Sequence, residues 1–155
     1  MKNIDLELIA IAKNVDKYRD NLPLDQVTEI SRTMTHIINS LFRESTSELE
    51  EYIGEVSMEI LLLADMLMLE PYAGLLSTDT FSFDLSVYSE HSEVQILTEV
   101  LTHLRNMCTL LIESPNDVSG QEKALWSMVL LLDLFTASIG LSMSGCKHLI
   151  RDTLS

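Results

Sequence analysis

Three regularly spaced glutamates are the residues of this chain that could bind a metal ion. Glu51, Glu55 and Glu59 follow one another every fourth residue, which stacks three carboxylates along one face of a helix. Hard cations such as Mg²⁺ prefer oxygen ligands, and carboxylates on facing helices of a bundle can hold them. Together with Glu29 on the preceding helix, this spacing predicts a magnesium site. The competing interpretation, which we favour, is the solvated face of an amphipathic helix.

Glu59 differs from the other acids in its surroundings. It follows Met58 and precedes Ile60, Leu61 and Leu62, so the chain around it is apolar. A charged group in apolar surroundings is costly unless it is paired. We therefore expect Glu59 to lie at a helix edge, to be protonated, or to be paired with a metal ion.

Two stretches of this region carry a likeness to a known family. Gln26-Val27-Thr28-Glu29 and Glu50-Glu51-Tyr52-Ile53-Gly54-Glu55-Val56 resemble the MazG-like all-α nucleoside triphosphate pyrophosphatases. Those enzymes carry an E-E-x-x-E motif and an E-x-x-D motif on successive helices, which hold Mg²⁺ over the nucleotide phosphates. The likeness spans residues 26–69, keeps only Glu29 of the first motif and displaces the leading acid of the second to Glu51. It implies a magnesium-dependent pyrophosphohydrolase with a degraded ligand set.

No other group of residues completes a catalytic centre. The chain has no glycine-rich phosphate loop. Its histidines lack the paired spacing that is typical of metal ligands: His36, His91, His103 and His148. We therefore favour a protein without enzymatic activity and without a cofactor, and keep magnesium for the alternative alone.

Apolar residues at helical spacing predict helices along most of the chain. A first stripe predicts a helix that ends near Asn21, and a second helix begins at Pro23, because proline suits the first helical turn. The seam from Val94 to Leu111 predicts a further bundle helix. The apolar run from Ala124 to Leu141 predicts a fully surrounded helix, and a short closing helix follows over Cys146 to Thr153.

Local signals predict where two helices begin and where one ends. Ser47 with Glu50, and Ser119 with Glu122, match the capping box, in which side chains satisfy the free amides of the first turn. Pro71 is expected to end the helix that carries the three glutamates, because proline cannot continue a helix.

One stretch, from residue 71 to residue 89, lacks the helical period. Phe81 to Tyr88 alternate apolar and polar residues, as in a half-buried strand. The whole chain contains only five glycines and three prolines, which favours a few long helices. We predict an all-α fold in which residues 1–155 form a single-domain bundle of five to six helices. One irregular or strand-like excursion interrupts it at about 71–89.

The net charge of −14 restricts the classes of partner. The ten lysines and arginines are scattered, so we expect no direct binding of nucleic acid. A strong negative field attracts cations, which leaves a basic protein partner or mimicry of nucleic acid open. Asp133 in the middle of the apolar run argues against a membrane span. Cys108, Cys146 and an N-terminus without a signal sequence favour a reduced protein of the cytoplasm.

Interaction surfaces offer the other route to a function. We expect a small acidic protein that binds another protein as a regulator, inhibitor or adaptor. Phe81, Phe83 and Trp126 are the candidate interface residues. The surplus of apolar helix surface predicts a homodimer, with helices or the 81–88 segment at its seam. The alternatives are the MazG-like hydrolase, using Glu29 with the three spaced glutamates, and an acidic mimic of nucleic acid that blocks a DNA-binding enzyme.

Overall fold

The computed structural model describes residues 3–69, 88 and 90–155. Within these residues the chain forms six α-helices and no strand, so the predicted all-α fold is confirmed. In chain order the helices are α1 (Asn3–Ala12), α2 (Pro23–Phe42), α3 (Thr46–Met66), α5 (Glu93–Glu113), α6 (Val118–Ser138) and α7 (Met143–Leu154). The predicted strand over 81–88 falls outside the described residues except for Tyr88, which packs against the main core.

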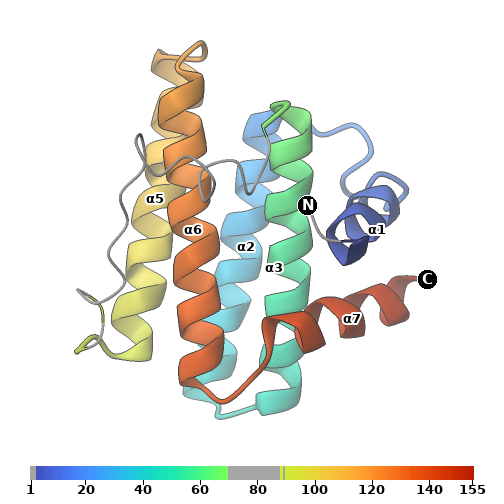
Figure 1. The fold of residues 1–155 in the computed structure, drawn as a ribbon, viewed down its shortest axis with the longest axis vertical. Helices are drawn as coiled ribbons and strands as arrows, with labels where there is room; N and C mark the ends of the chain where they lie inside the picture. The colour runs from blue at the N-terminus through green and yellow to red at the C-terminus, as the bar shows by residue number, and fades with distance from the viewer. Residues whose placement is uncertain (1–2, 70–87, 89) are drawn as a thin grey trace.

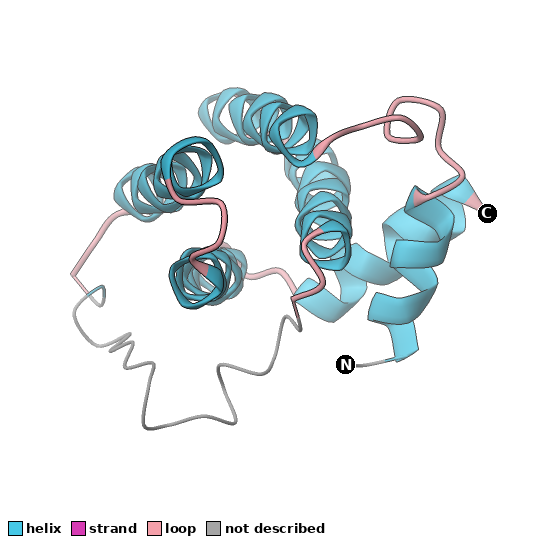
Figure 2. Cartoon of the chain, turned by 90° about the horizontal axis from the view of Figure 1, so that it is seen from above, coloured by secondary structure: helices cyan, strands magenta, loops and turns pink. Residues whose placement is uncertain are grey.

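Four long helices, α2, α3, α5 and α6, stand side by side as a bundle, and α1 and α7 lie against one side of it (Figure 1). Seen from above, α1 and α7 lie next to each other on that side (Figure 2). The bundle encloses the larger apolar core. A second apolar cluster joins α1, α3 and α7 and contains Leu8, Tyr18, Met58, Leu62 and Ile150.

α3 is the helix that both cores share. It contacts α2 and α6 within the bundle and α1 and α7 outside it. Its second half is therefore buried on every side, from Ile60 to Ala64. This burial explains why residues 60–64 are all apolar: a helix segment without a solvated face has no position where a charged side chain can stay in water. The sequence predicted such a surrounded helix at Ala124–Leu141, but Asp133 and Ala137 of that run are exposed.

Several helix ends differ from those predicted. α1 ends at Ala12 and not near Asn21, and the Asn14 side chain donates to the Ala10 carbonyl at 3.2 Å. Such a local bond competes with continued helix. α3 ends before Pro71, because Met68 adopts a φ of 57° and the Leu69 amide donates back into the last turn.

Both predicted capping boxes are wrong in register. α3 begins at Thr46 behind Ser45, which makes no side-chain cap. α6 is capped by Asp117, whose carboxylate accepts the Gly120 amide at 2.9 Å. The residue that precedes each helix, Ser45 or Asp117, therefore lies two residues before the predicted cap. The capping box that does form is at Ser92, ahead of α5.

The link from α6 to α7 turns sharply. Gly140 adopts a φ of 79°, which glycine tolerates without steric cost, and the two helix axes differ by 99°. Among the described residues, no helix on its own has the length and hydropathy of a membrane span, and α6 with α7 reaches them only as this bent pair.

Candidate functional site

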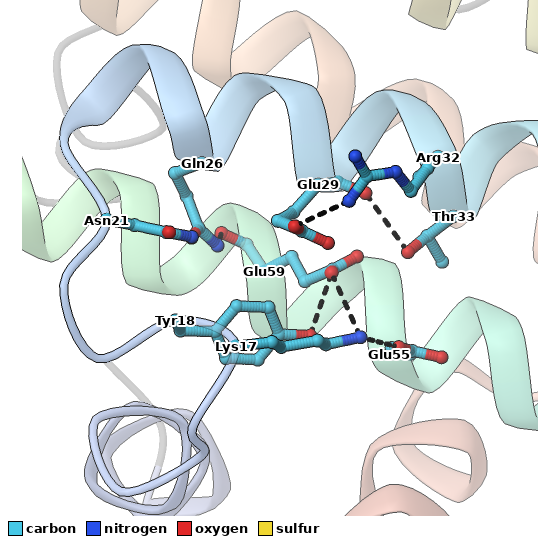
Figure 3. Close-up of polar contacts among 9 residues, drawn as sticks. All are labelled: Lys17, Tyr18, Asn21, Gln26, Glu29, Arg32, Thr33, Glu55 and Glu59. Atoms are coloured by element: carbon cyan, nitrogen blue, oxygen red, sulfur yellow. Dashed lines mark hydrogen bonds and ion pairs between the residues drawn. The ribbon is translucent and has the colours of Figure 1, made fainter.

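The candidate site is a buried carboxylate, that of Glu59 on α3 (Figure 3). The side chain is 0% exposed. Tyr18, from the connection between α1 and α2, donates its hydroxyl to Glu59 Oε2 at 2.8 Å. The other oxygen, Oε1, accepts no hydrogen bond, and the nearby Thr33 hydroxyl donates to the Glu29 carbonyl at 3.2 Å instead. The carboxylate is therefore only half satisfied.

A lysine stands beside this carboxylate and its neighbour on α3. Lys17 Nζ lies 2.6 Å from Glu55 Oε1 and 3.9 Å from Glu59 Oε2. Burial lowers the pKa of Lys17, but the carboxylates of Glu55, Glu59 and Glu29 outweigh this effect and raise the pKa overall. Lys17 is thus a permanent cation. Its ammonium group lies beside Glu55 and Glu59, two of the acids for which the sequence predicted a metal ion.

Burial raises the pKa of Glu59 to about 7. The Tyr18 hydroxyl and the Lys17 ammonium oppose this shift, whereas the Glu55 carboxylate adds to it. Burial also raises the pKa of Tyr18, and the charge of Glu59 raises it further, so Tyr18 stays protonated and serves as a donor only. The site can therefore exchange one proton near neutral pH, at Glu59.

A glutamine ties the site to the start of α2. Gln26, which is fully buried, donates from Nε2 to the backbone carbonyl of Glu59 at 3.0 Å and accepts from Asn21 Nδ2 at 3.1 Å. Together with Tyr18 and Lys17, these bonds fasten the 13–22 connection across α3. Because Tyr18 is 2% exposed and Glu59 is 0% exposed, a substrate has no path to the carboxylate while this connection is in place.

The four glutamates of the magnesium prediction do not form one ligand set. Glu29 pairs with Arg32 at 2.8 Å, and Glu51 is exposed to solvent. Glu55 and Glu59 share Lys17. Across the described part of the chain, no group of three or more His, Cys, Asp or Glu is arranged to hold a metal ion. The solvated-face interpretation is right for Glu51 and wrong for Glu59, and the metal assignment stays a prediction without support from this geometry.

Only one of the predicted interface residues, Trp126, lies in the described part of the chain. Trp126, on α6, is 1% exposed and belongs to the interior of the single chain. Phe81 and Phe83 fall outside the described residues. Of the three predicted interface residues, the described part of the chain therefore contains only Trp126, and it is buried.

The sequence pattern did not predict three further members of the site: Lys17, Tyr18 and Gln26. Tyr18 was assigned to the apolar stripe of the first helix, and Gln26 was noted only within the family likeness. One signal was present, since an acid as deeply apolar in sequence as Glu59 requires a partner. The partner could not be identified because Tyr18 and Glu59 are 41 residues apart in the chain.

The likeness to the MazG-like family concerns these same two helices, α2 and α3. Comparison of the chain with protein-family models, with curated proteins and with solved structures finds no match. The description of the site therefore rests on the burial and the hydrogen bonds of its residues.

A pH dependence of stability follows from the raised pKa of Glu59. Between its ordinary value of 4.5 and about 7, the unfolded chain is ionised at this position while the folded chain keeps the proton. Stability should therefore fall as pH rises through this window and level off above it, by a total on the order of 3 kcal/mol. Glu59→Gln, which is neutral at every pH, should lose this component.

The measurement is chemical denaturation of both proteins between pH 4.5 and pH 8. The quantity of interest is the difference in unfolding free energy between wild type and Glu59→Gln, because the other carboxylates contribute equally to both. A difference that stays constant across the window would contradict the assignment.

Proposed function

We propose that this chain is a non-enzymatic protein of the cytoplasm that regulates or adapts another protein by binding it, and that the partner presents a cationic surface. The observation that carries the proposal is the pairing of its charges. Most of the described lysines and arginines are already bound to acids of the same chain. The acids outnumber the lysines and arginines by 14, so many carboxylates of the described residues enter no ion pair there.

These free carboxylates include a group at the turn from α2 to α3. Glu44 and Glu51 are exposed there and enter no ion pair within the described residues. Phe42, beside them at the end of α2, is 71% exposed. An acidic surface next to an exposed aromatic side chain suits a basic, amphipathic segment, because the charges steer the encounter and apolar contact retains it.

The proposal is tested with an amphipathic helical peptide rich in lysine and arginine, titrated against the protein by calorimetry. We expect saturable binding that weakens as salt is raised, because exposed charges are screened. Glu44→Gln with Glu51→Gln should weaken binding several-fold. The matched control is Glu113→Gln with Glu122→Gln, which removes the same charge where α5 passes to α6. No saturable binding, or an equal loss in both variants, would refute the proposal.

The alternatives have separate readouts. Under the hydrolase alternative, nucleoside triphosphates with Mg²⁺ would release pyrophosphate, and Glu55→Gln would abolish the release; we expect no release from either protein. Under the nucleic-acid mimic, a DNA-binding enzyme would be captured and double-stranded DNA would compete for it. Under the proposed function, the captured partner is not a DNA-binding enzyme.

A further inference from the structure

One face of this acidic protein carries almost no charge. On α2 the residues Leu24, Thr28, Ser31, Thr35, Ile38 and Phe42 are spaced by four and three, which places them on one side of the helix. All are exposed or partly exposed, and Phe42 is 71% exposed. No acid or base interrupts this stripe over the length of α2.

α5 carries a stripe with the same spacing. Its members are Val94, Thr98, Leu101, Arg105, Cys108 and Ile112. Val94 and Ile112 are 40% and 63% exposed, and the others are exposed or partly exposed. Arg105 is the one charge, and its aliphatic stem can cover apolar surface while the guanidinium reaches water.

The two stripes form a single surface. A groove of about 310 Å³ runs between them, and its wall contains Thr28 and Ser31 from α2 and Leu101, Arg105 and Cys108 from α5. The helices run in opposite directions (Figure 1). Leu24 therefore lies at the same end as Ile112, and Phe42 at the same end as Val94. We call this surface the α2–α5 face.

Most hydroxyl groups of the α2–α5 face already donate a hydrogen bond within their own helix, so they do not need a water molecule as acceptor. Thr28 and Thr35 donate to the carbonyls of Leu24 and Ser31 at 3.2 and 3.1 Å. Thr98 donates to the carbonyl of Val94 at 2.8 Å. With these donors satisfied inside the helix, covering the face leaves few polar groups unpaired.

We propose that the α2–α5 face binds a second copy of this chain as a symmetric dimer. Breadth and length favour this occupant. A single partner helix is about 10 Å wide and would fill the groove alone, whereas a second helix pair matches both stripes. Each stripe is about 27 Å long and the pair is about 20 Å broad, so two copies bury roughly 1,100 Å² in total, enough for a specific interface.

Charge also selects this face. Two copies that each carry −14 repel one another wherever their carboxylates meet, and a face without carboxylates avoids this at contact. The long-range repulsion remains, and salt screens it. The dimer should therefore tighten as salt is raised, opposite in sign to the cationic-peptide binding above.

The experiment measures mass by analytical ultracentrifugation at micromolar concentration, in low and high salt. Wild type should form a dimer that strengthens with salt. Thr98→Glu and Thr35→Glu each place a carboxylate on the α2–α5 face and should weaken the dimer by about tenfold or more. Asn106→Glu is the control: it adds the same charge to an exposed position of α5 that faces the α5–α6 groove, and should dimerise as wild type does.

Cysteine labelling reports on the face itself. Cys108 is partly exposed on the groove, whereas Cys146 is buried and burial raises its pKa to about 11, so only Cys108 should react. Its reaction rate should fall as protein concentration rises, and should not fall in Thr98→Glu. A monomer at every concentration and salt would overturn the proposal. So would a dimer in which Cys108 stays reactive, or one that Asn106→Glu weakens as much as Thr98→Glu.

Discussion

Replacing Lys147 by methionine is expected to destabilise the protein by about 3–5 kcal/mol, since it removes one partner of a buried ion pair. Lys147 Nζ on α7 donates to Asp5 Oδ1 on α1 at 2.8 Å. Asp5 is 0% exposed, and its Oδ2 accepts no other hydrogen bond. Without the ammonium group the carboxylate remains buried with no counter-charge, and methionine restores the apolar stem but not the charge.

The measurement is urea denaturation of wild type and Lys147→Met at pH 7, with helix content followed by circular dichroism. Arg151→Met is the matched control, because Arg151 on the same helix pairs with Glu7 of α1 at the surface, at 3.2 Å. Exposed pairs contribute about 0–1 kcal/mol. Asp5→Leu combined with Lys147→Met should recover most of the loss, because no uncompensated charge is left. Equal losses in Lys147→Met and Arg151→Met would contradict the role of burial.

Gly54→Ala should destabilise the protein by about 2 kcal/mol or more, although alanine is the better helix former by about 1 kcal/mol. At Gly54, α7 crosses α3 with its backbone against the glycine. An added Cβ would clash with the Cys146 carbonyl oxygen, and would lie 3.0 Å from its carbonyl carbon and 3.1 Å from Ile150 Cβ. A backbone carbonyl inside a helix cannot rotate away, so α7 must shift as a whole.

Gly145→Ala provides the control with the opposite sign. It also lies in a helix, and the nearest atom to its added Cβ is 3.6 Å away, which is an ordinary contact. Its helix propensity should stabilise the protein by up to about 1 kcal/mol. Thermal unfolding of the two variants should thus move in opposite directions. Stabilisation by Gly54→Ala would show that α3 and α7 do not approach this closely.

The all-α fold of this chain could be predicted from its sequence because apolar residues recur every three or four positions, which is the period of an amphipathic helix. The stripes of α2 and α5 predicted their helices with little error, and the scarcity of glycine and proline excluded many short strands. The ends were less predictable. Ser47 and Ser119 matched the capping pattern, yet Ser45 and Asp117 are the residues that precede the helices. At α6 the Asp117 carboxylate accepts the Gly120 amide, so Asp117 and not Ser119 is the cap.

The site was predictable in part for the same reason. The spacing of Glu51, Glu55 and Glu59 placed them on one helix, and the apolar neighbours of Glu59 marked it as unusual. The four-residue spacing alone does not distinguish the exposed Glu51 from the buried Glu59, and the apolar neighbours of Glu59 do not identify its partner. The difference arises because the 13–22 connection crosses α3 at Glu59 and leaves Glu51 in solvent.

The sequence by itself determined the fold class, the main helices and the net negative charge, because periodicity and composition are properties of the chain alone. Only the tertiary structure decided which acids are paired, which helix is surrounded and which face is uncharged. Lys17 and Glu59, or Asp5 and Lys147, are brought together by packing across 42 and 142 residues. A contact between residues that are distant in the chain depends on how whole helices pack against each other, and local sequence patterns do not predict this packing.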